Sequence, residues 1–220
     1  MRALVFGATG MVGHGVLLEC LRDPEIDLAQ AVGRSATGIQ DAKLRELVVP
    51  DLLRYEGFEP LLSDFDACFF CLGVSSGGLS EADYARITYD ITVAAATTLA
   101  RLNPNMVFLY ISGAGTDSSE KGGSMWARVK GKTENALLRL PFRAAYMFRP
   151  AAIQPLDGVR SKTPAYRLFY TLTKPILPLL RTMAPSYITT TRELGRAMIT
   201  VAKRGGPSKI IESADIRGLA

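Results

Sequence analysis

Residues 4–15 read Leu-Val-Phe-Gly-Ala-Thr-Gly-Met-Val-Gly-His-Gly, and this stretch decides the fold. An apolar run of strand type enters the first glycine, and a helical pattern of apolar residues follows the third. Such a turn gathers backbone N–H groups and the positive end of a helix dipole at one point, which suits a pyrophosphate. Gly7 permits the tight turn, Gly10 lets a phosphate approach the backbone, and Gly13 lets the helix pack on the sheet. The pattern therefore predicts a dinucleotide site, whose contact residues are Gly7, Thr9, Gly10, Met11, Val12 and Gly13.

Strand and helix patterns alternate along the rest of the chain. Apolar runs predict strands at 3–6, 28–32, 44–49, 67–72, 106–111 and 144–148, with a short final strand at 209–212. Helical patterns lie between them at 11–21, 80–102, 124–140 and 191–203, and Ser80 is placed to cap the second of these. Several strands are apolar throughout, as in a parallel sheet that is covered on both faces. We therefore predict an α/β fold with a doubly wound parallel sheet, a three-layer Rossmann domain.

The whole chain, residues 1–220, is expected to form one domain. Residues 154–190 interrupt the alternation with five prolines and an aromatic, basic helical pattern, which predicts a small C-terminal lid over the site. The alternative for residues 166–183 is a helix that lies on an anionic membrane surface, although its prolines would break such a helix. Aromatic and basic residues are not interleaved in a nucleic-acid-binding motif, so no nucleic acid is expected.

Composition bounds the class of protein. The chain has 220 residues, 48% of them hydrophobic, which is enough for a sizeable core. No apolar run is long enough to span a bilayer and no signal-peptide pattern precedes the first strand, so a cytoplasmic protein is expected. Cys68 and Cys71 stand three apart in a predicted strand, where their side chains point to opposite faces. We therefore expect buried thiols and no metal site.

The net charge of +5 conceals an asymmetry. Residues 1–120 hold 8 basic and 16 acidic side chains, whereas residues 121–220 hold 18 basic and 5 acidic ones. A basic half of this kind attracts anions and favours an anionic small-molecule substrate. The alternative is a solvated basic surface with no special partner.

Polar residues and a glycine follow the second, third and fourth predicted strands. A basic residue after the second strand accommodates the 2′-phosphate of NADP(H), where an acidic one would bind the ribose of NAD(H). Arg34, with Ser35 beside it, therefore predicts NADP(H) in preference to NAD(H). Asp51 could accept a hydrogen bond from the adenine amino group, or it is an ordinary loop aspartate. Leu72-Gly73 marks a place where backbone passes close to a ligand, or a plain turn.

A second group of residues surrounds the end of the fifth strand. Ser112 ends that strand and is followed by glycines, a position where a substrate carbonyl could be held. Trp126 and Lys130 share one face of the next helix because they are four residues apart, and both should point toward Ser112.

With these pieces the chain resembles the short-chain dehydrogenase/reductase superfamily. The likeness is to its extended and atypical members, the NAD-dependent epimerase/dehydratase-like proteins and the Tat-interacting-protein oxidoreductase branch. The matching pieces are the glycine turn, Arg34, Cys71-Leu-Gly73, Ser112, Val129-Lys130-Gly131 and Phe148-Arg-Pro150. The resemblance implies a catalytic serine at Ser112 and a catalytic lysine at Lys130 that also binds the nicotinamide ribose. It also places Arg149, Pro150 and Ile153 beside the nicotinamide, and it implies hydride transfer to a small carbonyl compound.

Trp126 departs from the pattern, because it occupies the position of the catalytic tyrosine. An indole N–H donates a hydrogen bond but does not ionise, so it cannot shuttle a proton. Three alternatives follow. Tyr110, Tyr84 or His14 could serve instead; the chemistry could differ, with Lys130 keeping only its ribose contact; or the protein could bind the cofactor without turnover, as a sensor or interaction partner. Asp90, on the long helix, matches an acid of the related branch and is expected to stabilise a polar network.

Overall fold

A computed structural model describes residues 1–156 and 187–220. Its centre is a seven-stranded sheet in the order β3-β2-β1-β4-β5-β6-β9, and every neighbouring pair of strands is parallel. The strands are β1 (Arg2–Phe6), β2 (Leu28–Gly33), β3 (Leu44–Val48), β4 (Ala67–Phe70), β5 (Val107–Ile111), β6 (Ala144–Arg149) and β9 (Ile210–Glu212). A separate two-stranded parallel sheet joins β7 (Ala152–Gln154) to β8 (Ile188–Thr190).

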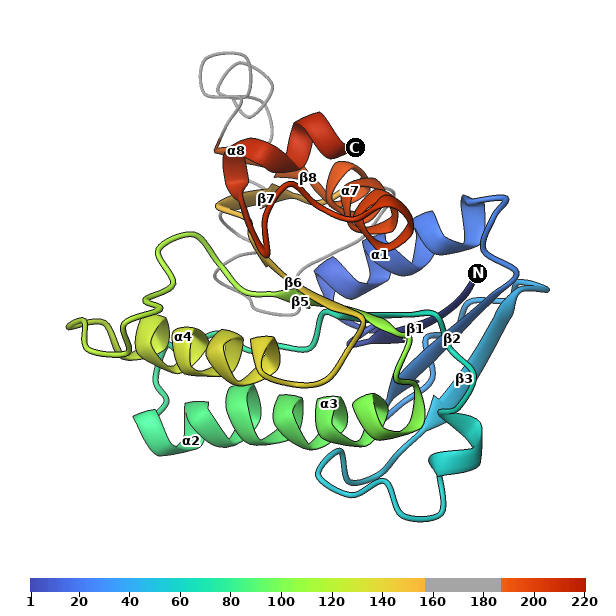
Figure 1. Ribbon diagram of the computed structural model, residues 1–220, viewed down its shortest axis with the longest axis horizontal. Helices are drawn as coiled ribbons and strands as arrows, with labels where there is room; N and C mark the ends of the chain where they lie inside the picture. The colour runs from blue at the N-terminus through green and yellow to red at the C-terminus, as the bar shows by residue number, and fades with distance from the viewer. Residues whose placement is uncertain (157–186) are drawn as a thin grey trace.

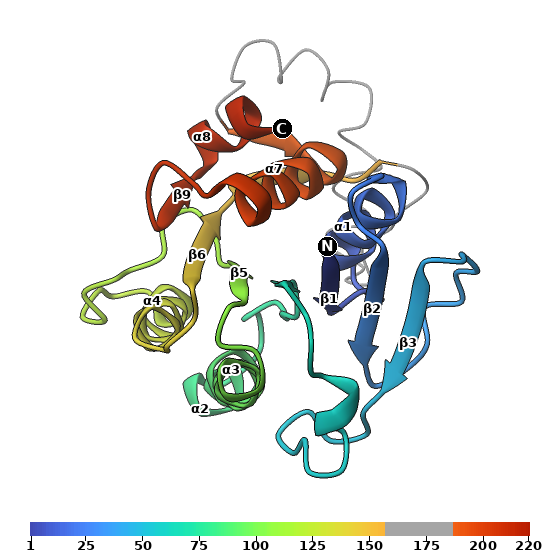
Figure 2. The same cartoon turned by 45° about the vertical axis from the view of Figure 1, so that its right-hand side comes forward.

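Helices cover both faces of the seven-stranded sheet (Figures 1 and 2). One face carries α1 (Met11–Arg22) and α7 (Thr191–Arg204), and the other carries α3 (Ile91–Leu102) and α4 (Met125–Leu138). Shorter elements are η1 (Glu59–Leu61), α2 (Glu81–Ala85), α8 (Ser213–Ile216) and η3 (Arg217–Leu219). The predicted doubly wound α/β fold with three layers is therefore confirmed.

Burial explains which apolar runs became strands. Every residue of β4 and β5 is buried, as expected for central strands with helices on both sides. On the α3 and α4 side, aromatic rings stack from one strand to the next, with ring centroids 5.0 Å apart for Phe6 and Phe70 and 5.8 Å for Phe70 and Phe108. Cys68 lies on this side and Cys71 on the other, as the strand pattern predicts.

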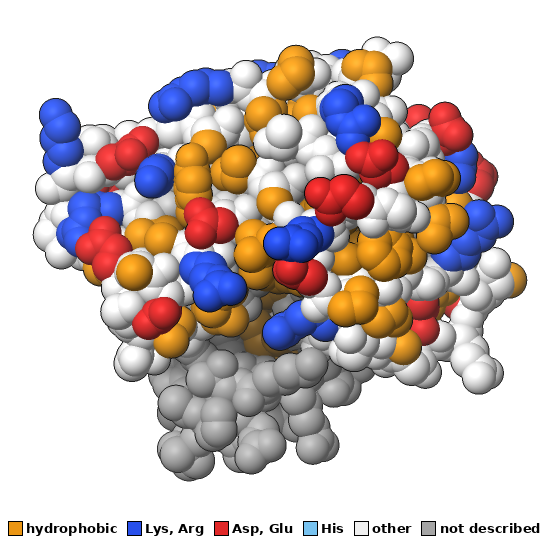
Figure 3. Space-filling view, turned by 90° about the horizontal axis from the view of Figure 1, so that it is seen from below, with side chains coloured by type: hydrophobic (Ala, Val, Ile, Leu, Met, Phe, Trp, Pro, Cys, Tyr) orange, Lys and Arg blue, Asp and Glu red, His pale blue; other side chains and the backbone are white. Residues whose placement is uncertain are grey.

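The helix expected over residues 80–102 is divided. A single π-helical turn, η2 (Arg86–Asp90), separates α2 from α3. The predicted cap is confirmed, because the Ser80 hydroxyl oxygen accepts the Asp83 N–H at 3.1 Å. Across the outer face of these helices, hydrophobic side chains are interspersed with charges of both signs (Figure 3).

Glycines allow α1 and α7 to approach closely. A Cβ atom at Gly15 would lie 2.6 Å from Cβ of Thr191, and one at Gly195 would lie 2.9 Å from Cγ of Glu19. Glu19 is 4% exposed at this contact. Its carboxylate accepts hydrogen bonds from Arg22 at 2.5 Å and from Arg196 at 3.0 Å.

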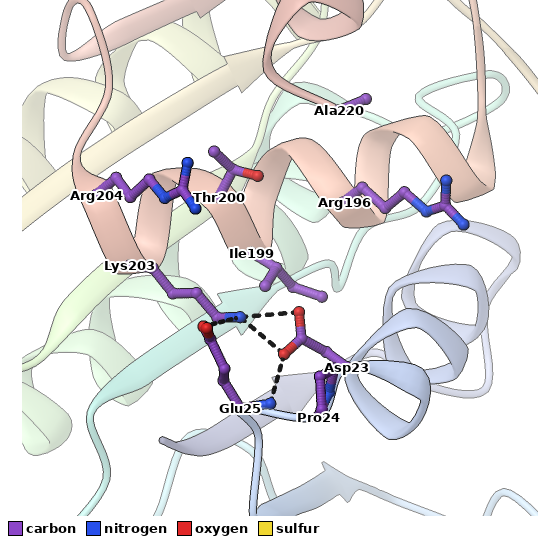
Figure 4. A pocket seen from close by; sticks show the side chains of 9 residues that line it. All are labelled: Asp23, Pro24, Glu25, Arg196, Ile199, Thr200, Lys203, Arg204 and Ala220. Carbon is purple, nitrogen blue, oxygen red and sulfur yellow. Dashed lines mark hydrogen bonds and ion pairs between the residues drawn. The ribbon is translucent and has the colours of Figure 1, made fainter.

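The basic second half of the chain is thus partly neutralised by the acidic first half. Besides the Arg196–Glu19 pair, Lys203 of α7 binds Asp23 at 2.7 Å and Glu25 at 2.5 Å. The shallow pocket of Figure 4 lies here, at the carboxyl end of α1 and so at the opposite end from the glycine turn. These two cations of α7 are therefore engaged by acids of the first half, while the expectation of an anionic substrate stays a prediction.

The predicted lid, residues 154–190, lies largely outside the described residues, as does the whole of the 166–183 segment considered for a membrane surface. Its two described ends meet in the β7–β8 pair. Within residues 1–156 and 187–220, no helix has both the length and the apolar composition needed to cross a bilayer.

The crossing of α1 and α7 gives a stability prediction. Gly15→Ala should lower the free energy of unfolding by about 1–3 kcal/mol, because Thr191 Cβ is fixed to the α7 backbone and cannot move aside cheaply. Urea denaturation measures this change. Gly123→Ala is the control, since no atom lies within 4 Å of its Cβ position, and it should change stability by less than about 0.5 kcal/mol. Equal effects of the two substitutions would contradict the packing argument.

Candidate dinucleotide-binding site

The glycine turn has no room for side chains at two of its positions. Gly7 has φ +75°, and a Cβ atom there would lie 2.7 Å from the backbone N of Leu72. A Cβ atom at Gly13 would lie 2.2 Å from the carbonyl oxygen of Gly7. Such contacts are shorter than real Cβ atoms tolerate, so the end of β1, the start of α1 and the end of β4 meet through backbone alone.

The first turn of α1 presents donors to an anion. Gly10 is its N-cap and supplies no capping side chain, and no acidic residue lies in the first turn. The Gly10 N–H donates to the Gly7 carbonyl at 2.9 Å, and the His14 N–H starts the helical ladder by donating to Gly10. The amides of Met11, Val12 and Gly13 precede that ladder, so they have no partner within the helix. Half-buried Thr9 flanks them.

This turn lies at the switch point of the strand order, between β1 and β4. Leu72 and Gly73 follow β4 and lie beside it. Gly73 does not adopt a positive φ, and no atom lies within 4 Å of its Cβ position. The turn and its surroundings do not require a glycine at position 73. The space that the missing side chain leaves open is where a ligand would pass.

Arg34 and Ser35 lie where the sequence places them, directly after β2, which is the next strand to β1. Both side chains are exposed. In the part of the chain that the structure describes, the Arg34 guanidinium makes no hydrogen bond or ion pair, so it is free to bind an anion. Asp51, after β3, accepts the Leu53 N–H at 3.0 Å and so closes its own turn, while its carboxylate stays exposed.

Ser112 follows β5 and joins a pair of hydroxyl groups that the sequence did not reveal. Its Oγ lies 2.8 Å from Oγ1 of Thr116. Thr116 donates its own proton to the Gly113 carbonyl at 2.7 Å, so Ser112 is the donor of the pair. The Ser112 oxygen thus keeps its lone pairs for a ligand, while its proton is engaged. The one sequence signal for this hydroxyl pair is that Thr116 follows Ser112 by four residues.

Trp126 and Lys130 converge on the end of β5, as their helical spacing predicts. The Trp126 ring lies 3.8 Å from the Cβ position of Gly113 and 3.6 Å from that of Gly115. Lys130 Nζ donates to the Ile111 carbonyl at 3.0 Å. The indole therefore covers the loop after Ser112, and the ammonium is tied to the residue before it.

Lys130 is a buried cation. Its side chain is 9% exposed, and Nζ lies 4.8 Å from the centroid of the Tyr110 ring. Burial lowers the pKa of Lys130 to about 8, and the Glu134 carboxylate partly offsets this effect. Tyr110 is fully buried, and burial raises the pKa of its hydroxyl far above the ordinary value, which makes it a poor replacement for the missing tyrosine.

Arg149 is held by several side chains of the protein itself. Its guanidinium binds both oxygens of Glu134, with Nε 3.0 Å and Nη2 2.5 Å away, and it also binds Glu212 at 3.1 Å and Ser118 at 2.6 Å. Glu134 is completely buried. These bonds fasten α4 to β6 and β9, so the guanidinium is engaged within the protein, while the place of residues 149–153 beside a nicotinamide stays a prediction. Glu134 is a second residue missed from the sequence, although it lies one helical turn after Lys130.

The remaining candidate residues, which are Pro150, Ile153, His14 and Asp90, lie in different parts of the fold. Pro150 is buried and accepts the Ala114 N–H at 3.0 Å through its carbonyl, and Ile153 pairs with Thr189 between β7 and β8. His14 lies in α1, where partial burial lowers its pKa. Asp90, at the end of the π-helical turn, is exposed.

The fold and the glycine turn define a Rossmann-type domain of the kind found in short-chain dehydrogenases and NAD-dependent epimerases. A UDP-N-acetylglucosamine 4-epimerase from Methanobrevibacter ruminantium superposes with a TM-score of 0.69 at 14% identity, over 96% of this chain and 74% of that one. A short-chain dehydrogenase family protein from Francisella tularensis gives 0.65 at 13% identity, over 100% and 99%. A UDP-glucuronic acid 4-epimerase from Bacillus cereus, solved in complex with NAD, gives 0.69 at 15% identity, over 96% and 76%. These similarities establish the fold.

Curated relatives are more similar in sequence. The mitochondrial protein fmp52-2 of Aspergillus oryzae is 25% identical over 224 residues, which cover 97% of this chain and 94% of that protein. FMP52 of Meyerozyma guilliermondii is 26% identical over 156 residues, and the match spans 65% of its length. No family model matches the chain. Because these relatives are named mitochondrial proteins, the expectation of a cytoplasmic location is overturned.

Lys130 gives a prediction with a defined sign. Lys130→Met should raise the free energy of unfolding at about pH 7 by roughly 1–3 kcal/mol, because it removes a cation that burial disfavours. Above the folded pKa of about 8 and below the ordinary value of 10.5, folded wild-type protein has lost this proton and unfolded protein has kept it. Wild-type stability therefore rises with pH in that range and approaches that of the variant.

Chemical denaturation across this pH range tests the prediction, with Lys132→Met as the control. Lys132 is exposed, so its replacement should leave the pH dependence unchanged. A Lys130→Met protein that is less stable than wild type at every pH would show that the contacts with Ile111 and Tyr110 outweigh the cost of burial.

Proposed function

We propose that this protein binds a nicotinamide dinucleotide with its pyrophosphate at the glycine turn and that it prefers NADP(H) over NAD(H). The observation that carries the proposal is the pairing of two features at neighbouring strand ends. The first turn of α1 carries no capping side chain, and the guanidinium of Arg34, which has no partner among residues 1–156 and 187–220, follows the adjacent strand. An acidic residue in place of Arg34 would favour NAD(H).

The chemistry we propose is that of an atypical short-chain dehydrogenase/reductase, close to the Tat-interacting-protein branch. The substrate class is a small carbonyl or hydroxyl compound, and an oxidoreductase or epimerase-like activity follows from it. The cofactor would supply the hydride. Lys130 would hold a ribose hydroxyl with its ammonium, the Ser112 oxygen would contact the substrate, and Trp126 would exclude water from the loop after β5.

One observation favours a second function, a cofactor-binding sensor or interaction protein without turnover. The indole of Trp126 carries no titratable proton, Ser112 donates its own proton to Thr116, and Lys130 donates to a backbone carbonyl. Neither the indole of Trp126 nor the hydroxyl of Ser112 is thus poised to give a proton to a substrate. The two functions share the cofactor site and differ only in turnover.

Cofactor preference tests the first proposal. Arg34→Asp should weaken NADPH binding by about tenfold to a hundredfold, because it replaces a charge-assisted hydrogen bond with repulsion. NADH binding should change little. Isothermal titration with both nucleotides measures this, and Arg45→Asp, a change of equal charge at an exposed position of β3, is the control. If Arg34→Asp prefers NADPH over NADH as strongly as the wild-type protein does, Arg34 does not bind the 2′-phosphate.

Turnover separates enzyme from sensor. As an enzyme, the wild-type protein should oxidise NADPH in the presence of at least one compound of a broad carbonyl panel. Trp126→Tyr should then raise the rate by about a hundredfold, because a phenol can deliver the proton that an indole cannot. Trp126→Phe, which has a ring without a hydroxyl, should not. Binding of NADPH without turnover by the wild type and by both variants would support the sensor.

A further inference from the structure

The segment that carries Arg34 and Ser35 has no helix to support it. Parallel neighbouring strands are usually joined through a helix that packs on the sheet. Here β2 ends at Gly33 and β3 begins at Leu44, and the residues between them form loop and turn only. The place of the Arg34 backbone therefore depends on what holds this loop.

Glu46 of β3 holds the loop of residues 34–43 through hydrogen bonds, and we call it an anchor of this loop. Its Oε1 accepts the Thr37 N–H at 2.5 Å and also the Thr37 hydroxyl. A further hydrogen bond comes from the Gly38 backbone, and together these bonds lower the pKa of Glu46. The other anchor is Ile39, which packs against the core between α1 and the sheet.

The register places Glu46 on the strand next to the one that leads into Arg34. Glu46 is level with Ala31 of β2, three residues before Arg34. By Coulomb's law, a carboxylate near a phosphate weakens the binding of that phosphate. Any favourable effect of Glu46 on NADP(H) binding must therefore come from the loop that it holds. The Arg34 guanidinium has no partner among the described residues, so the backbone of residues 34–38 alone sets the point from which this side chain reaches a ligand.

We propose that Glu46 is a positioning residue for cofactor selection: it holds residues 34–38 so that Arg34 and Ser35 face the 2′-phosphate of NADP(H). The inference rests on the proposed function, because it needs Arg34 to be the phosphate ligand. It adds a residue on a different strand that never touches the cofactor.

Positioning and simple electrostatics predict opposite signs for one substitution. Glu46→Ala removes a negative charge, which by charge alone should strengthen binding of a phosphorylated nucleotide. If Glu46 acts through the loop, the same change should raise the Kd for NADPH by about fivefold to tenfold and leave the Kd for NADH within about twofold. Thr37→Val, which removes the hydroxyl that donates to Glu46 and accepts the Ile39 N–H at 3.2 Å, should change the Kd for NADPH in the same direction.

Titration of NADPH and NADH into each variant gives these constants without any turnover. Asp41→Ala is the matched control, because it lies in the same loop, removes the same charge and breaks a carboxylate–backbone bond, that to the Lys43 N–H at 2.8 Å. It should leave the ratio of the two Kd values unchanged. Amide exchange measured by NMR should show faster exchange of the Thr37 N–H in Glu46→Ala, which confirms that the anchor exists in solution.

A double-mutant cycle identifies the route of the effect. In an Arg34→Ala background, Glu46→Ala should cause no further loss of NADPH affinity, because the guanidinium that it positions is gone. A full additional loss there, or an equal loss for NADPH and NADH in the wild-type background, would overturn the inference while leaving the cofactor proposal intact. Equal affinity of the wild-type protein for the two nucleotides would overturn both.

Discussion

The structure depends on a backbone-to-backbone contact at the start of the chain. Gly13 of the first helical turn lies so near the Gly7 carbonyl that no side chain fits between them, and Gly7 in turn touches the backbone after β4. This contact fixes the amino end of α1 over the switch point of the sheet. Because Gly10 is the N-cap, no side chain caps the helix, and the amides of its first turn have no partner within the helix.

Much of this could be predicted from the sequence, because the relevant signals are local. The apolar runs, the glycine turn and the cap at Ser80 each depend on residues within a few positions of one another. The π-helical turn at Arg86–Asp90 could not be predicted, since its residues at most lower helix propensity and include no glycine or proline to mark a break. The site divides in the same way. The glycine turn and Arg34 lie where expected, while the partners of Ser112 and Arg149 come from loops and elements that only the fold brings together.

The charge pattern of the sequence does not by itself tell which cations are available to a ligand. Counting residues shows a basic second half, but it does not show which acids the fold places beside each base. Glu19 lies between arginines of two helices. Lys203 binds Asp23 and Glu25, although Asp23 lies 180 residues earlier in the sequence. Those charges contribute to docking α7 on α1. Arg34 differs because it projects from a loop and has no acid bound to it among the described residues. Its surroundings therefore make it a candidate anion ligand, which a count of cations could not show.

Lys130 shows how the same fold sets the state of a group at the site. Burial against Tyr110 favours the neutral amine, whereas Glu134, one turn further along α4, favours the ammonium. Glu134 cannot exert its full effect, because Arg149 binds both of its oxygens. The net result is that the pKa of Lys130 is lowered from its ordinary value to about 8. Arg149 therefore influences the site without contact, through the carboxylate that it shares with the helix, and its burial follows from that structural task.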